Sequence, residues 1–169
     1  MIQWQFYPKS LDAPKLIKEV VKAFQKIEED INSQTHTEQI SNVVLRTITP
    51  HLQQLEFQVE TGKKSGETIE VPVLFGRNGK FEKSFRADGY HIEEKTVIEI
   101  EAGRAVSNNQ FLKDLFQACM MHNIDFLILA VRNKYRGKDD FDKVVTFFDT
   151  LYASDRMKLP LKGIAVIGY

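Results

Sequence analysis

The spacing of apolar residues along the chain predicts helices around a strand-rich middle. Apolar side chains recur every three or four residues in four stretches, which is the period of an amphipathic helix. Asp12 is a good N-cap for the first of these helices, and Pro50 is expected to kink or split the second. The four helices are predicted at residues 12–31, 37–55, 108–122 and from Asp139 or Asp140 onward.

Between and after these helices, short apolar or alternating stretches predict β-strands. Residues 125–131 are almost continuously apolar, which is typical of a central strand covered on both faces and paired in parallel. The Asn78-Gly79 pair predicts a tight hairpin turn. Residues 4–7 are predicted as either a short strand or a packed arm, and the remaining strands at residues 57–60, 71–75, 81–88, 96–102 and 163–168.

The order of these elements predicts the fold class. Helices come first, then antiparallel strands, then helix, strand, helix and strand. This order predicts an α/β fold in which a mixed sheet is flanked by helices. The length of 169 residues is most simply one domain, residues 1–169.

The composition indicates where in the cell the protein is expected, but it does not indicate a function. Lys plus Arg and Asp plus Glu both number 23, so the formal net charge is zero, and only a local basic surface could attract nucleic acid. No apolar run of ~18 residues predicts a membrane span. The first residues do not resemble a signal peptide, and Cys119 is the only cysteine, so we expect a cytoplasmic protein without internal disulfides.

The stretch from 85 to 103 carries the candidate chemistry. Glu99 and Glu101 are two residues apart on a predicted strand, so they project from the same face. A hairpin through 91–95 brings Asp88 beside them. Crowded carboxylates favour a hard divalent cation, although glutamates on a solvated strand face are the simpler alternative.

Such a cluster suits metal-dependent hydrolysis. We expect Asp88, Glu99 and the backbone carbonyl of Ile100 to hold one or two Mg²⁺ ions. A bound Mg²⁺ lowers the pKa of a coordinated water and neutralises charge on a phosphate. Glu101 is then a candidate general base, or a further ligand.

The pattern of Asp88, ten intervening residues and Glu99-x-Glu101 resembles the PD-(D/E)xK nuclease superfamily. The resemblance covers roughly residues 35–131 and implies a restriction endonuclease-like αβββαβ core. The chain departs from the pattern at Ala87, where proline is usual, and at Glu101, where lysine is usual. The E-x-E version is similar to that of restriction enzymes of the BamHI and BglII type, and it leaves a positive charge missing near the attacking water.

The resemblance also implies an acidic residue on the helix before the sheet. Glu38 is the matching candidate for a catalytic role. The sequence Thr35-x-x-Glu38 is equally a capping box, in which Glu38 would bind the backbone at the start of the helix.

Basic loops supply candidate DNA contacts. One lies in a glycine-flanked turn, one follows the acidic strand at a helix N-terminus, and one follows the buried strand. For each residue, simple solvation of a surface charge is the alternative. The candidates are Lys63, Lys64, Arg104, Asn108, Arg132, Lys134 and Arg136.

Other cofactors are not indicated. The four histidines lack the spacing of zinc ligands, and no G-x-x-x-x-G-K-[ST] loop predicts a nucleotide cofactor.

The sequence therefore favours a Mg²⁺-dependent endonuclease of duplex DNA, of type II restriction-enzyme kind. The resemblance implies a homodimer, because two protomers are needed to cut both strands. The alternatives are a catalytically inactive nuclease-fold protein that binds nucleic acid or a protein partner, and a repair-type nuclease.

Overall fold

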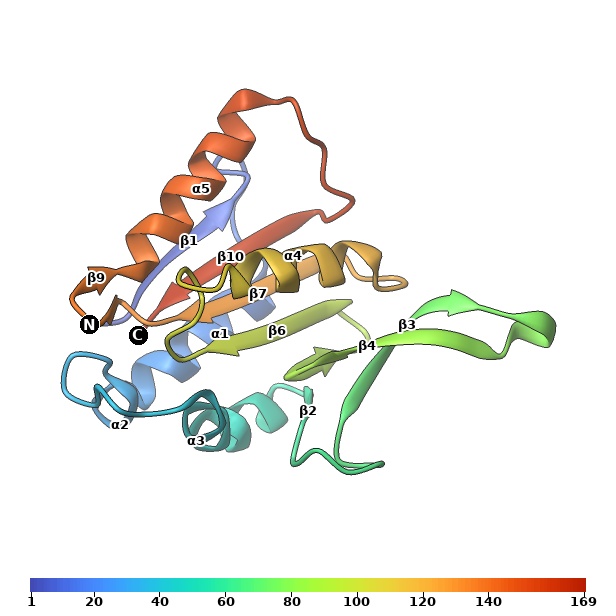
Figure 1. Ribbon diagram of the computed structural model, residues 1–169, viewed down its shortest axis with the longest axis horizontal. Coiled ribbons are helices and arrows are strands. Elements are labelled where there is room, and N and C mark those ends of the chain that lie inside the picture. The colour runs from blue at the N-terminus through green and yellow to red at the C-terminus, as the bar shows by residue number, and fades with distance from the viewer.

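A six-stranded mixed sheet forms the middle layer of the protein, which a computed structural model describes over all residues from 1 to 169 (Figure 1). The strands lie in the order β1-β10-β7-β6-β5-β2. Their bounds are β1 Gln3–Tyr7, β2 Gln58–Val59, β5 Gly89–His91, β6 Thr96–Glu101, β7 Phe126–Val131 and β10 Gly163–Gly168.

The middle of this sheet is parallel and its edges are antiparallel. Strands β10, β7 and β6 pair in parallel, and β7 lies between the other two. Strand β1 pairs antiparallel with β10, and β5 pairs antiparallel with both β6 and β2. The α/β class and the mixed sheet are therefore as predicted, and the apolar run at Phe126–Val131 is the buried central strand.

Helices cover both faces of the sheet (Figure 1). On one face, Ile98 and Ile100 of β6 pack into a core with α1, α2 and α3. On the other face, Val97 of β6 packs into a core with α4 and α5. The helices are α1 Lys15–Lys26, α2 Glu28–Ile31, α3 Ser41–Gln54, α4 Gln110–Met120 and α5 Asp140–Ser154. None of them combines the length and apolar composition needed to cross a membrane.

Three helix predictions need correction. The first predicted helix is broken at Ile27, whose φ of −110° leaves the helical region, so α1 and α2 are separate. The second begins at Ser41 rather than at residue 37, and it continues unbroken through Pro50. In the third predicted helix, at residues 108–122, the apolar spacing predicts that Phe116 and Met120 point inward, but both side chains are about half exposed in α4.

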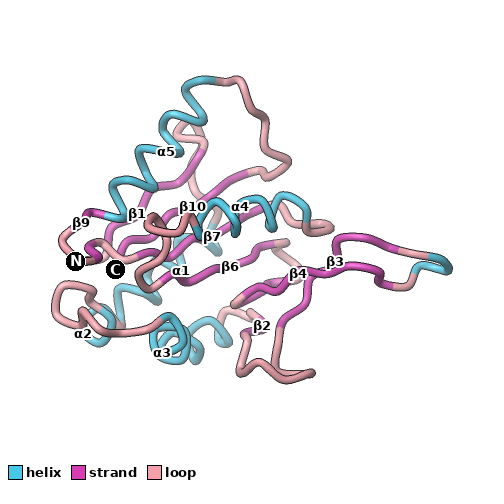
Figure 2. The backbone as a smooth tube through the Cα atoms, viewed as in Figure 1, coloured by secondary structure: helices cyan, strands magenta, loops and turns pink.

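Strands β3 (Ile69–Phe75) and β4 (Phe81–Ala87) form a two-stranded sheet of their own. The tube view shows this hairpin extending away from the helices and the main sheet (Figure 2). Its turn, η1 (Arg77–Gly79), contains the predicted Asn78-Gly79 pair, and both residues have the positive φ that such a turn needs. We call residues 69–87 the β-arm. A second small hairpin, β8 (Lys134–Tyr135) with β9 (Lys138–Asp139), lies within the predicted basic loop.

Candidate functional site

Asp88 lies at the junction between the β-arm and the main sheet. It follows the last residue of β4 and precedes β5, whose Gly89 pairs with Ile98 of β6. Asp88 Oδ2 accepts a hydrogen bond from the Ile100 backbone N–H at 2.8 Å. The hairpin therefore brings Asp88 beside the acidic strand, as the sequence predicted.

Glu99 and Glu101 share one face of β6, and this face is turned toward α4. Both line a cavity of about 440 Å³ together with Asp88. We call this space the acidic cavity. Its other lining residues are Ser41, Glu60, Ser84, Phe85, Arg86, Ala87, Ile100, Lys113, Asp114 and Gln117.

Helix α4 adds a charged pair to the acidic cavity. Asp114 is only 2% exposed, and its Oδ1 lies 3.3 Å from Lys113 Nζ. Its Oδ2 is buried without a hydrogen-bond partner. A buried carboxylate oxygen without a partner is costly, and burial raises the pKa of Asp114, so this side chain adds to the crowding of acids at Glu99 and Glu101.

The pKa values of these acids reflect their crowding. Burial, followed by the Glu60 and Asp114 carboxylates, raises the pKa of Asp88 to about 6. Burial and the carboxylates of Asp114 and Asp88 raise the pKa of Glu101 to about 7. Burial also raises the pKa of Glu99, and the negative charge of Asp88 adds to that increase. The cavity therefore disfavours its own full ionisation when no cation balances it.

The chemistry of these side chains fits a hard divalent cation. Mg²⁺ prefers oxygen ligands, and five carboxylates line the cavity, those of Glu60, Asp88, Glu99, Glu101 and Asp114, together with the cations of Arg86 and Lys113. Ile100, whose carbonyl is the predicted further ligand, lines the same cavity and donates its N–H to Asp88. In this structure, no three His, Cys, Asp or Glu side chains are drawn together closely enough to form a metal-ligand group.

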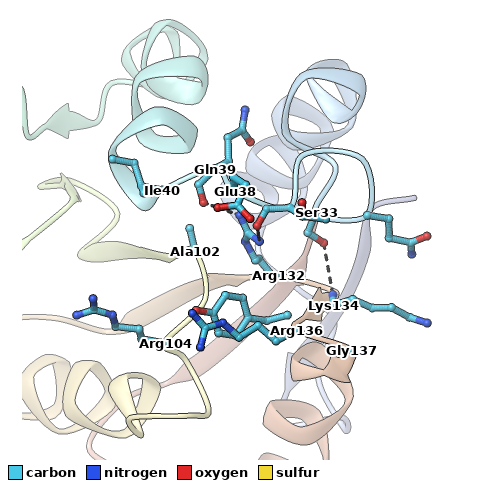
Figure 3. A pocket seen from close by; sticks show the side chains of 13 residues that line it. Ser33, Glu38, Gln39, Ile40, Ala102, Arg104, Arg132, Lys134, Arg136 and Gly137 are labelled. Carbon is cyan, nitrogen blue, oxygen red and sulfur yellow. Dashed lines mark hydrogen bonds between the residues drawn. The ribbon is translucent and has the colours of Figure 1, made fainter.

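Glu38 does not join this cavity. Residues 37–40 precede α3, so the side chain is not on a helix, and the predicted capping box at Thr35 does not form. Thr35 Oγ1 instead donates to the Asn32 carbonyl. Glu38 lines a different pocket, and Figure 3 shows it beside Arg132. The interpretation of Glu38 as a helix cap is therefore wrong, and as a candidate catalytic residue it lies in the neighbouring pocket and does not line the acidic cavity.

That second pocket, of about 640 Å³, is basic (Figure 3). Three of the candidate DNA-contact residues, Arg104, Lys134 and Arg136, line it with exposed side chains. It adjoins the acidic cavity, because Ser41 lines the cavity, Ala102 lines the pocket, and Ala102 N–H donates to Ser41 Oγ at 3.0 Å. We call it the basic pocket.

Arg132 has a different position from the other arginines of the basic pocket. It is 2% exposed, and its guanidinium donates to the carbonyls of Thr37, His36 and Gln39. Most of its donors are therefore used to hold the loop before α3. This position gives Arg132 a structural role and leaves few of its N–H groups free for the predicted DNA contact.

The other predicted DNA-binding residues are exposed but dispersed. Asn108 lines a third pocket, which shares Arg104 and Arg136 with the basic pocket. Lys63 lines a separate pocket beside α3, and the Lys64 backbone N–H donates to Glu67 Oε2 at 3.0 Å. The structure thus brings Arg104, Arg136 and Asn108 together but leaves the two lysines elsewhere.

The sequence reasoning missed Asp114, Lys113 and Glu60. Asp114 had a detectable signal, because it occupies an inward position between Phe111 and Leu115, where an apolar residue is expected. Glu60 had no detectable signal in the sequence, because its place beside Asp88 depends on the pairing of β2 with β5. This pairing brings the Glu60 N–H to the Asp88 carbonyl, at 2.8 Å.

Comparison with known proteins does not assign the chain to a family. No protein-family model matches the chain, and no curated protein matches it either.

Proposed function

We propose that the protein is a Mg²⁺-dependent endonuclease that hydrolyses phosphodiester bonds in duplex DNA. The observation that carries this proposal is the contact of two oppositely charged spaces. Carboxylates of Asp88, Glu99 and Glu101 surround the acidic cavity, and the basic pocket begins on the other side of the Ser41–Ala102 hydrogen bond. A polyanion held by the basic pocket has one of its phosphate groups next to the acids.

The acidic residues have separate roles in this proposal. Asp88, Glu99 and the Ile100 carbonyl are the groups that would hold one or two Mg²⁺ ions. When bound, Mg²⁺ activates water and neutralises negative charge on the phosphate. Glu101, on the same face as Glu99, accepts the proton of the attacking water or acts as a further ligand.

Lys113 supplies the positive charge that Glu101 does not. Burial alone would lower the pKa of this lysine, but the carboxylates of Asp114, Glu99 and Glu101 outweigh burial and raise it. The ammonium group is therefore held in its charged form beside the acidic cavity. Such a cation stabilises the negative charge that develops on the phosphate during attack.

Residues of the basic pocket position the DNA. Arg104 and Arg136 are exposed and line both this pocket and its neighbour, so one phosphate chain can contact them in succession. Cutting both strands of a duplex requires two such sites, which a homodimer with two-fold symmetry would provide.

The experiment is cleavage of plasmid and genomic DNA with Mg²⁺, Mn²⁺ or EDTA. We expect metal-dependent cutting that Glu99→Ala abolishes, because this change removes a ligand from the proposed site. The matched control is Glu19→Ala on α1, a helix on the opposite face of the sheet, and it should cut normally. Normal cutting by Glu99→Ala, with its fold verified by circular dichroism, would refute the assignment of the site.

The second candidate function is a nuclease-fold protein that binds nucleic acid or a protein partner without cutting. The observation that favours it is the lack of any three acidic or histidine side chains gathered as metal ligands. Gel shifts of DNA that are the same for the parent and for Asp88→Ala, without cleavage in Mn²⁺, would support this function over the first.

A further inference from the structure

The β-arm joins the acidic cavity directly. Strand β4 ends at Ala87, the residue before Asp88, and Ser84, Phe85 and Arg86 line the cavity wall. From this base the arm extends outward to the turn at Arg77–Gly79 (Figures 1 and 2). Seven residues of strand, at ~3.3 Å each, give it a reach of roughly 23 Å.

The arm is fixed against the body of the protein along the length of β3, through Pro72 and Phe75. The His122 backbone N–H donates to the Pro72 carbonyl at 2.7 Å. The ring of Phe75 packs edge-to-face on His122, with 4.9 Å between centroids, and on Phe81, with 5.5 Å. The exposed aromatic residues of the arm therefore stiffen it, and they hold its direction relative to Asp88.

The outer part of the arm carries three cations that form no ion pair, and one exposed acid, Glu82. Arg77, Lys80 and Lys83 are exposed, and none of them forms an ion pair. The one ion pair of the arm joins Arg86 to Glu70 near its base, at 3.6 Å. A stiff two-stranded ribbon with unpaired positive charges at its end is complementary to a phosphate-lined groove.

We propose that the β-arm lies in the major groove of duplex DNA beside the bond held at the acidic cavity. The major groove is wide enough to admit a two-stranded β-ribbon. Arg77, Lys80 and Lys83 then contact the phosphates along that groove. This inference rests on the proposed nuclease function, and it names the element that grips the duplex.

The test is binding of a fluorescently labelled 30-base-pair duplex, measured by anisotropy in Ca²⁺ at several salt concentrations. The variant combines Arg77→Ala, Lys80→Ala and Lys83→Ala. We expect at least about tenfold weaker binding and a salt slope smaller by about 2–3, since each lost phosphate contact lowers the slope by ~1. The matched control combines Lys15→Ala, Lys22→Ala and Lys26→Ala on α1, which removes the same charge from the opposite face of the sheet.

Three results would overturn the inference. These are equal binding by the arm variant and the control, a parent protein that does not bind the duplex, and a parent dimer that the arm variant alone converts to monomer. The last result would assign the arm to self-association.

A separate measurement distinguishes this inference from the proposed function. Bis(p-nitrophenyl) phosphate is too small to reach from the cavity to the outer end of the arm, so the arm variant should hydrolyse it in Mn²⁺ at the parent rate. If the parent hydrolyses neither this substrate nor DNA, the proposed function fails, while the anisotropy result still decides whether the arm binds a duplex.

Discussion

Lys113 shows how a single residue can change the interpretation of the acidic strand. The E-x-E pattern on β6 lacks a lysine, yet Lys113 enters the same cavity from α4 and pairs with Asp114 at 3.3 Å. A charge that is absent from a sequence motif can thus be present in the folded site. Only the packing of α4 on β6 reveals it.

A substitution tests the role of Lys113. We expect Lys113→Met to lower the cleavage rate by about 10–100-fold, because one cation that faces the reacting phosphate is lost. Lys113→Arg should retain more activity, since it keeps the charge. The measurement is the single-turnover cleavage rate in Mg²⁺. A rate for Lys113→Met equal to that of the control Lys15→Met would contradict the role.

Individual side chains also mark the limit of sequence reasoning. The positions of Asp88, Glu99 and Glu101 were predictable, because alternation along a strand and one short hairpin determine them. Glu38 was expected on a helix, because the second helix was predicted to begin at residue 37, but α3 begins four residues later, at Ser41.

At the scale of the element, α4 was predictable in place but not in orientation. Hydrophobicity alone puts Phe116 inside, whereas the helix is rotated so that Asp114 and Ala118 are buried. This rotation presents Lys113 and Asp114 to the acidic cavity. The β-arm was predictable as a hairpin, but nothing in its pattern indicated that it leaves the main sheet.

The loop before α3 depends on one arginine. Arg132 donates to three of its carbonyls, so Arg132→Leu leaves those partly buried acceptors without their donor. We expect the free energy of unfolding to fall by about 3 kcal/mol, measured by urea denaturation. Lys134→Ala, an exposed change nearby, is the control and should change stability by less than about 0.5 kcal/mol. Equal stability of the two variants would rule out this role.

At the scale of the whole molecule, the crowded carboxylates make stability depend on pH. The pKa of Asp88 is raised from 3.8 to about 6, and that of Glu101 from 4.5 to about 7. The folded state therefore binds protons more tightly than the unfolded state at these groups. Their destabilising effect is complete above pH 7 and decreases as the pH falls toward the unfolded values.

We accordingly expect the metal-free protein to become more stable as the pH is lowered from 8 to 5. The gain should be about 1–3 kcal/mol in the free energy of unfolding, measured by urea denaturation in EDTA. Asp88→Asn combined with Glu101→Gln should flatten this dependence. A parent protein that loses stability over the same range would contradict the pKa shifts.

The order of strands in the main sheet has a consequence for biosynthesis. Strand β1 has β10 as its only neighbour, and Gln3 pairs with Gly168. A ribosome adding 5–20 residues per second makes β1 roughly ten seconds or more before β10 exists. The nascent chain therefore carries an unpaired apolar segment around Phe6 throughout translation. Any product terminated before Gly163 lacks the strand that joins β1 to β7, and it offers both of those exposed edges to chaperones and proteases.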